Sequence, residues 1–213
     1  MLISEILNED SPIKLGEASR PIVAIYPGRF SPPHIGHMKA WQWLNDKYGK
    51  AFIATSDKVA PPKSPFNFNE KKRLFMHAGV PTDAIVQVRN PYMASEIIDR
   101  YDPEKITVIF AVSKKDMDED PRFAFKPKKD GSPGYLQPWE ANQGNPEPAS
   151  VHGYVATVPT FKFNVNGKPM KSATEFRANF ANADESTQAR MIEDLYGKYS
   201  EEVHQLMRDK IVQ

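Results

Sequence analysis

The chain has 213 residues, enough for one domain with its own core, or for one domain with an appendage. It contains no cysteine, which excludes disulfides, thiolate nucleophiles and cysteine-bound zinc. The 28 Lys and Arg residues against 27 Asp and Glu leave a net charge of +1. Bulk charge therefore gives no sign of nucleic-acid binding, and no nucleic-acid partner is expected.

The N-terminal stretch, residues 1–20, is interpreted as an extension that precedes the domain. It carries Glu5, Glu9 and Asp10 and lacks the basic region and long apolar stretch of a secretory signal. No run in the sequence approaches the roughly 18 apolar residues that a membrane span needs. We therefore expect a cytoplasmic protein with no membrane partner.

From residue 21 onward, short β-rich runs alternate with helical patterns. The runs are IVAIY (22–26), AFIAT (51–55), AIVQV (84–88) and ITVIFAV (106–112), and helices are expected over 36–48, 69–79 and 93–101. Such alternation is typical of βαβ units and predicts an α/β fold with a parallel sheet. The second helix has recognisable ends, because Asn67 and Glu70 have capping-box spacing and Gly79 follows the last turn.

The pattern changes after residue 125. Residues 126–150 hold many Pro and Gly residues and few aliphatic ones, so we interpret them as a long loop outside the core. Our hypothesis is that Tyr135 and Trp139 make this loop a lid over a substrate. A β-rich stretch follows at 154–165, with Asn166-Gly167 as a turn. Helices are expected from about Ser172 onward, and residues 186–213 form a C-terminal helical segment.

The stretch GRFSPPHIGH, residues 28–37, follows the first strand and opens a helix. Ligands of open α/β sheets bind at the carboxyl ends of strands, and a helix N-terminus suits phosphate. His34 and His37 add donors for charge that develops on a phosphoryl group, and Gly36 allows close approach. The alternatives are two cap histidines without a ligand, or a zinc site, which would need a third ligand from His77, His152 or His204.

A second element, KSATEFR, occupies residues 171–177. Ser172 and Glu175 form the S-x-x-E pattern of a capping box, so Ser172 is expected to start a helix. Ser172, Thr174 and Arg177 would then gather hydroxyls, backbone N–H groups and a guanidinium around one helix start, which suits an anion such as a polyphosphate. The alternative is an ordinary cap with a solvated arginine.

Together the two elements resemble the nucleotidylyltransferase superfamily, which shares G-x-F…H-x-G-H early and I-S-x-T-x-x-R late. The resemblance covers about residues 21–185 and implies a Rossmann-like parallel sheet with helices on both faces, followed by C-terminal helices. It also implies attack by a phosphate of an acceptor on the α-phosphorus of ATP or CTP, with release of pyrophosphate. Mg²⁺ would be bound mainly through the triphosphate, without a set of protein ligands.

The resemblance also implies roles for individual residues. His34 and His37 would contact the triphosphate, and His37 would stabilise the α-phosphoryl group in the transition state. Of the remaining residues, Gly28, Arg29 and Phe30 would form the turn against the nucleotide, Gly36 would lie under the base or ribose, and Ser172, Thr174 and Arg177 would hold the β- and γ-phosphates. Lys171 departs from the family pattern, which has an apolar residue there.

The acceptor is less well defined by the sequence. Residues 61–76 resemble a region of bacterial nicotinate mononucleotide adenylyltransferases, whereas GRF is similar to the archaeal nicotinamide mononucleotide branch. Both favour adenylyl transfer to a pyridine mononucleotide, with NAD biosynthesis as the context. Lys58 and Lys63 are candidates for the acceptor's phosphate, with a solvated surface as the alternative.

Other readings stay open. Cytidylyltransferases and pantetheine-phosphate adenylyltransferases share both motifs, and a non-catalytic nucleotide-binding module would keep the phosphate site. Class I aminoacyl-tRNA synthetases share the HIGH signature, but the chain looks too short for an added anticodon-reading domain. Asp116 and Asp118 could orient a ribose or a hydrated Mg²⁺, or belong to a solvated acidic loop. An oligomer is possible.

Overall fold

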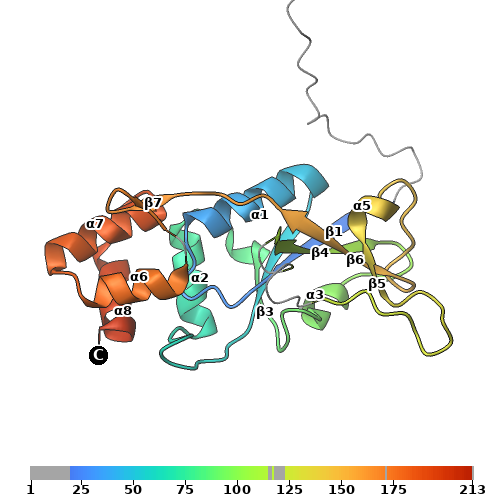
Figure 1. Cartoon of the computed structure of the whole chain (residues 1–213), viewed down its shortest axis with the longest axis horizontal. Helices are drawn as coiled ribbons and strands as arrows, with labels where there is room; N and C mark the ends of the chain where they lie inside the picture. Colours follow the sequence, from blue (N-terminus) through green and yellow to red (C-terminus); the bar gives the residue numbers. More distant parts are fainter. Residues whose placement is uncertain (1–19, 115–116, 118–122, 171, 213) are drawn as a thin grey trace, which may run out of the picture.

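A computed structural model describes residues 20–114, 117, 123–170 and 172–212. Within these ranges six strands form one sheet in the order β3-β2-β1-β4-β6-β5, and every neighbouring pair is parallel (Figure 1). The strands are β1 (Ile22–Pro27), β2 (Ala51–Thr55), β3 (Ile85–Gln87), β4 (Thr107–Ser113), β5 (Leu136–Pro138) and β6 (Gly153–Val158). The Rossmann-like α/β fold implied by the sequence is confirmed.

Helices cover both faces of the sheet unequally. The helices are α1 (Ile35–Tyr48), α2 (Phe68–His77), α3 (Ser95–Ile98), α5 (Trp139–Asn142), α6 (Ala173–Ala181), α7 (Glu185–Tyr196) and α8 (Glu201–Ile211), with a 3₁₀ turn at Thr82–Ala84. On one face, α1 and α2 share a core with alternate residues of β1 and β2. The short α3 packs on the other face.

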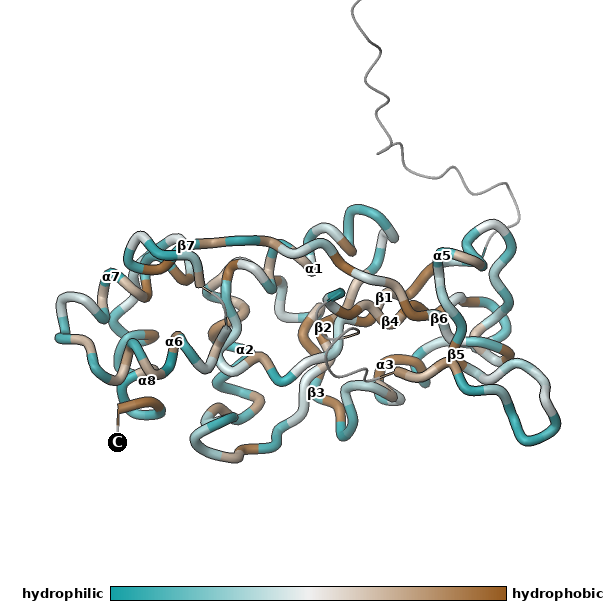
Figure 2. The backbone as a smooth tube through the Cα atoms, viewed as in Figure 1, coloured by the Kyte–Doolittle hydropathy of each residue, from teal (hydrophilic) through white to brown (hydrophobic). Residues whose placement is uncertain are grey.

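The central strands are buried on both sides, as in other parallel sheets. All six residues of β1 are buried, and its side chains alternate between the two cores, with Val23 and Ile25 in one and Ala24 and Tyr26 in the other. Figure 2 shows these strands as the most hydrophobic part of the chain. The uninterrupted apolar run IVAIY, which made the strand recognisable, is explained by this two-sided burial.

Several helix ends lie where the sequence predicts them. Asn67 and Glu70 form a complete capping box, in which each side chain accepts a hydrogen bond from the other residue's backbone N–H. The third helix is shorter than expected, since α3 replaces the helix expected over 93–101. Ala94 has a φ of 48°, in the left-handed region, so the helical backbone cannot extend through it toward Met93.

The C-terminal helices build a core of their own beside the sheet (Figure 1). The buried side chains of α6, α7 and α8 pack together and against Leu74 of α2 and Phe66. The cluster includes Phe176, Phe180, Met191, Ile192, Leu195, Tyr196, Val203 and Met207. Apolar packing therefore joins α6 to the two helices that follow it.

Residues 126–150 are more ordered than the expected loop. They contribute β5, which pairs with β6 at the edge of the sheet, and α5. The expectation that this stretch lies outside the core is wrong for Trp139, which is 4% exposed and packs against the rings of Tyr48 and Tyr154. A three-residue strand among prolines is too short to show the period-2 pattern by which strands are recognised.

The β-rich stretch expected at 154–165 is interrupted. β6 ends at Val158, and a short hairpin follows, formed by β7 (Asn164–Val165) and β8 (Lys168–Pro169). Its turn is Asn166-Gly167, as expected, and both residues have positive φ. The irregular residues 159–163 between β6 and the hairpin form one wall of the cavity described below.

Some sequence-based interpretations concern residues outside the described ranges. These are the N-terminal extension, apart from Arg20, and Lys171, Asp116 and Asp118. None of the helices in the described ranges is long and apolar enough to cross a membrane.

Candidate nucleotide-binding site

A cavity of about 210 Å³ opens at the carboxyl ends of three neighbouring strands. Tyr26 near the end of β1, Ser113 at the end of β4 and Val158 at the end of β6 line it. From β1 the chain adds β2 and β3 on one side of β1, and it then returns to add β4 on the other side of β1. β1 and β4 therefore flank the point where strand order reverses. Open α/β sheets bind their ligands at this position.

Two helices begin at the same cavity, although their first residues are far apart in the sequence. His34 is the N-cap of α1 and Ser172 is the N-cap of α6, and both line the cavity. The Ser172 Oγ accepts a hydrogen bond from the Glu175 N–H at 3.1 Å, as its capping spacing predicts. Each helix start offers free N–H groups and a positive dipole end, so the pair favours an anionic ligand.

The two histidines of the HIGH stretch lie against one another. Their rings stack with centroids 3.5 Å apart, and the His34 Nδ1 accepts the His37 N–H at 3.3 Å. Because Nδ1 is an acceptor, a neutral His34 carries its proton on Nε2 and can donate from there. The Nδ1 of His37 is buried and has no hydrogen-bond partner among the described residues.

Both imidazoles are neutral near pH 7. Burial lowers the pKa of His34 from 6.5 to about 3. Burial, and then the charge of the neighbouring His34, lower the pKa of His37 well below its ordinary value. A polyanion placed between the two helix starts would oppose this shift, because a nearby negative charge favours the protonated form.

Gly36 is required by its surroundings. A Cβ at this position would lie 3.1 Å from the His34 ring and 3.2 Å from the carbonyl oxygen of Phe161. The glycine therefore lets the connection 159–163 come close to the first turn of α1. The expected place of Gly36 under a base or ribose is untested, but the residue does line the cavity.

The turn between β1 and α1 is held by packing. Phe30 has a φ of 46° and is 6% exposed, and its ring lies edge-on to those of Tyr26, His37 and Phe75. A side chain on Gly28 would meet the Phe30 ring at 2.6 Å. Phe30 therefore supports His37 from behind, and the turn requires the glycine for steric reasons.

Arg177 reaches from α6 to this turn. It donates hydrogen bonds to the carbonyl oxygen of Ser31 and, at 3.3 Å, to the Thr174 hydroxyl. Burial, and then the positive charge of Arg29, lower the pKa of Arg177. The two guanidinium groups thus repel one another beside two helix starts, an arrangement that an anion would stabilise.

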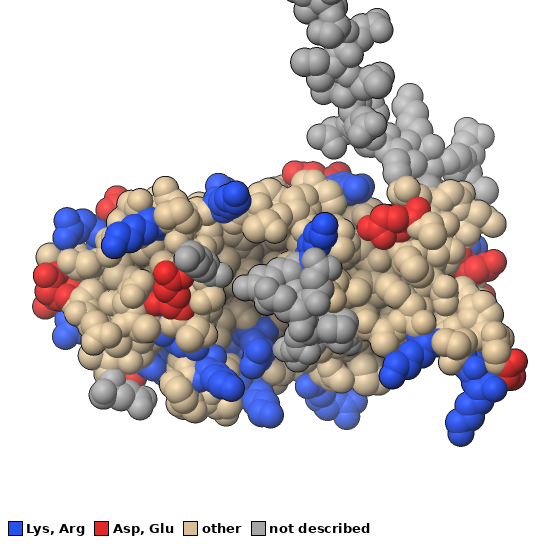
Figure 3. All heavy atoms as spheres, in the orientation of Figure 1, with Lys and Arg blue, Asp and Glu red and all other residues tan. Residues whose placement is uncertain are grey.

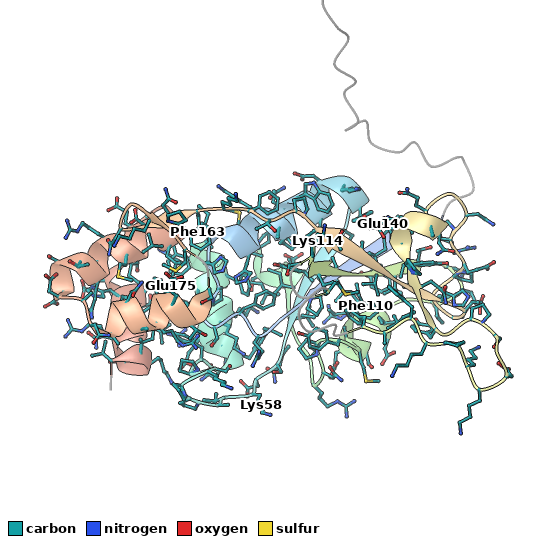
Figure 4. The ribbon with its side chains drawn as sticks, viewed as in Figure 1. Lys58, Phe110, Lys114, Glu140, Phe163 and Glu175 are labelled. Atoms are coloured by element: carbon teal, nitrogen blue, oxygen red, sulfur yellow. The ribbon has the colours of Figure 1, made fainter. Side chains whose placement is uncertain are left out.

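The two candidate acceptor residues lie apart from the cavity. Lys58 and Lys63 are exposed and belong to the segment between β2 and α2. In Figure 4, Lys58 lies at the lower side of the view, well away from Phe163, which lines the cavity. Figure 3 shows Lys and Arg side chains gathered along the same lower side. Their role as acceptor ligands stays a prediction.

The zinc alternative finds no support in the described part of the chain. Groups of three or more His, Asp or Glu side chains that could hold a metal ion are absent from the described residues. The other histidines have separate neighbours: His77 lies by the Lys198 carbonyl, His152 by the Tyr135 carbonyl and His204 by Gln188.

The lid hypothesis for residues 126–150 is wrong in this structure. Tyr135 donates its hydroxyl proton to the Ala149 carbonyl and precedes β5, which pairs with the beginning of β6. The cavity lies at the other end of β6, at Val158. Tyr135 and Trp139 instead pack beside the beginning of β6, at the end of the sheet opposite the cavity.

Sequence reasoning missed several residues of the cavity wall. Tyr26 and Ser113 could have been found, because Tyr26 ends one predicted strand and Ser113 directly follows another. Phe161, Phe163 and Met170 carry no such signal, since the connection between β6 and α6 has no periodic pattern. The ring of Phe163 lies 4.6 Å from that of His34.

The fold and the site define an α/β protein whose cavity lies at a strand-order reversal and at two helix starts. Arg177 lies outside the cavity lining and donates to the turn that precedes α1. A family model described as cytidylyltransferase-like matches residues 25–130, which hold the end of β1, the HIGH stretch and strands β2 to β4. The chain belongs to the nucleotidylyltransferase superfamily.

One curated relative is similar over a shorter segment. It is nicotinamide-nucleotide adenylyltransferase 1 of Sulfolobus acidocaldarius, 36% identical over 50 residues. The aligned segment spans 22% of this chain and 29% of that relative.

Proposed function

We propose that the protein transfers AMP from ATP to the phosphate of a pyridine mononucleotide, nicotinamide or nicotinate mononucleotide, and releases pyrophosphate. The observation that supports this best is the shared cavity of the two N-caps, His34 and Ser172, beside Arg177. Positioning and charge neutralisation are the main requirements of such a transfer, because no covalent enzyme intermediate is needed.

In this proposal an oxygen of the acceptor's phosphate attacks the α-phosphorus of ATP, and the bond from the α-phosphorus to the bridging oxygen of pyrophosphate breaks. His37 donates to the α-phosphoryl group as its charge grows, and His34 donates through Nε2. Ser172, Thr174 and Arg177 hold the β- and γ-phosphates. Their hydroxyls, guanidinium and helix start neutralise the pyrophosphate as it leaves.

A Mg²⁺ ion fits this site as a partner of the triphosphate. The described cavity wall offers imidazoles, N–H donors and several hydroxyl groups, but no carboxylate. Mg²⁺ prefers carboxylate, phosphate and water oxygens. The ion would add charge neutralisation between the phosphates, and the protein residues would hold the triphosphate that carries it.

Adenine and the pyridine acceptor are favoured by the archaeal relative, which is named for a nicotinamide nucleotide, and by the GRF and 61–76 stretches. The family description favours cytosine instead, so CTP is the second candidate. Both candidates use the same phosphate chemistry and differ in the base and the acceptor.

The experiment measures pyrophosphate release with Mg²⁺, crossing ATP and CTP with five acceptors: the two pyridine mononucleotides, phosphopantetheine, glycerol 3-phosphate and FMN. The proposal predicts release only with ATP and a pyridine mononucleotide, and its loss in His37→Ala. Release only with CTP would replace the adenylyl assignment. Tight ATP binding without release for any pair would favour a non-catalytic nucleotide-binding module.

A further inference from the structure

The loop that carries the HIGH stretch is attached to the C-terminal helices at two carbonyl groups. Arg177 of α6 donates to the Ser31 carbonyl, and Tyr196 of α7 donates its hydroxyl proton to the Pro33 carbonyl at 2.9 Å. The hydrogen bond from Tyr196 is buried. Its acceptor, Pro33, directly precedes His34, the N-cap of α1. Two helices outside the sheet thus hold consecutive parts of one loop.

Tyr196 is itself held in place. It is 5% exposed, and the ring of His77 on α2 lies edge-on to it at 5.2 Å. Gly197, the next residue, lies beside α1, since a Cβ there would be in ordinary contact, at 4.0 Å, with the Ile35 Cδ1. Burial raises the pKa of Tyr196 well above its ordinary value, so its phenol keeps its proton and stays a donor at neutral pH.

The geometry matters because His34 and His37 depend on the start of α1. His34 caps the helix, and the His37 N–H is bonded to the His34 ring. A shift of the Pro33 carbonyl would move the cap and with it both stacked rings. Misplacement of a reacting group by about 1 Å can cost about a hundredfold in rate.

We propose that Tyr196 is a positioning residue for nucleotidyl transfer, which acts through the Pro33 carbonyl to set the places of His34 and His37. Its hydroxyl does not reach the cavity lining, so it acts on the imidazoles and not on the substrate. The expected effect of Tyr196 on rate rests on the proposed function. Its effect on the positions of the two histidines does not, because that effect can be observed without substrate.

The test compares Tyr196→Phe with Tyr154→Phe. Tyr154 is a matched control, since it is also a buried tyrosine whose hydroxyl is bonded to the backbone, at the Glu147 N–H, but it lies at the beginning of β6, away from the cavity. Both variants are measured for melting temperature, kcat, the KM for ATP and the NMR signals of the histidine rings. The chain has five histidines, so these signals are few enough to assign.

We expect both variants to lose a similar amount of thermal stability. Only Tyr196→Phe should lower kcat, by about tenfold or more, while its KM for ATP stays within about threefold of the wild-type value. Only this variant should also shift the NMR signals of His34 and His37. Equal behaviour of the two variants in kcat and in these signals would overturn the proposal.

Failure of the proposed function is recognised separately. If the wild type releases no pyrophosphate with any substrate pair, the transferase assignment fails and the ring signals decide the positioning role alone. Should Tyr196→Phe not fold, His77→Ala removes the ring that supports Tyr196, and unchanged His34 and His37 signals in that variant would likewise overturn the proposal.

Discussion

At the scale of single residues, the site is built around two uncharged imidazoles. His34 and His37 stack against each other and are backed by Phe30 and Phe163, so the free protein keeps both rings neutral. Neutral imidazoles can still donate hydrogen bonds, and donation strengthens as charge develops on a phosphoryl oxygen. The two histidines and Arg177 should therefore affect different kinetic constants.

The variant His37→Ala should lower kcat by about 10²–10³-fold with little change in the KM for ATP, because its contact strengthens in the transition state. Arg177→Ala should instead raise the KM for ATP, because the guanidinium holds phosphates that are already charged in the ground state. Steady-state kinetics of both variants give the comparison, with His152→Ala as a histidine control remote from the cavity. Equal losses in both constants for both variants would contradict these roles.

Stability should depend on pH through His34. Its pKa falls from 6.5 in the unfolded chain to about 3 in the folded one, so below pH 6.5 the unfolded state binds a proton that the folded state excludes. The free energy of unfolding therefore falls as pH decreases from 6.5 toward 3. His34→Asn keeps a capping side chain and removes the titration, so it should gain stability relative to the wild type as pH falls.

The measurement is the urea midpoint of both proteins at several pH values from 4 to 8. Comparison with the variant removes the contribution of carboxylates, which titrate in both proteins. A constant difference between the two midpoints over this range would show that His34 titrates normally.

At the scale of elements, the cavity is formed where the start of α1 meets the connection 159–163. The sequence predicted the strand, the helix and its N-terminal histidines, because local propensity and capping chemistry specify them. It could not predict the connection as a wall, since Phe161 and Phe163 lie in an irregular segment that only tertiary packing brings to Gly36. The same lack of local signal explains the short β5, whose partner β6 follows a long insertion.

Gly36→Ala tests this contact. The added methyl group would meet the Phe161 carbonyl and the His34 ring at about 3 Å, and overpacking of this kind costs about 1–3 kcal/mol. A helical Gly-to-Ala change returns up to about 1 kcal/mol, so we expect a net loss of about 1 kcal/mol together with weaker ATP binding.

Chemical unfolding and calorimetric titration with ATP measure these two effects. Gly144→Ala is the matched control, because no atom lies within 4 Å of its added Cβ and its φ is not in the left-handed region. A Gly36→Ala variant that binds ATP as well as the control would mean that the connection can move away without consequence.

At the scale of the whole molecule, the sheet and the C-terminal helices form separate cores that meet at the site. α7 and α8 have the apolar spacing of amphipathic helices, so their existence was predictable, but periodicity alone did not say whether they pack on this chain. The structure gives them a shared core with α2 and α6, and Tyr196 connects that core to the HIGH loop.

A chain that ends at Ala183 should therefore fail as a nucleotide-binding protein. It loses Met191, Ile192, Leu195 and Met207, each at most 1% exposed. Burial of four such side chains contributes on the order of 6–12 kcal/mol, comparable to the whole stability of a domain. We expect a large fall in melting temperature and no ATP binding. A truncated chain that melts near the full-length value and still binds ATP would contradict the role given to the C-terminal core.

The central claim is that the site places the α-phosphorus of a triphosphate for attack by an acceptor. The most direct measurement incubates the protein with Mg²⁺, nicotinamide or nicotinate mononucleotide, and ATP labelled at either the α- or the γ-phosphorus. The account predicts that the α label enters the acceptor product and that the γ label leaves in pyrophosphate. Both products should form about 10²–10³-fold more slowly in His37→Ala. Transfer of the γ label to the acceptor, or undiminished transfer in His37→Ala, would contradict it.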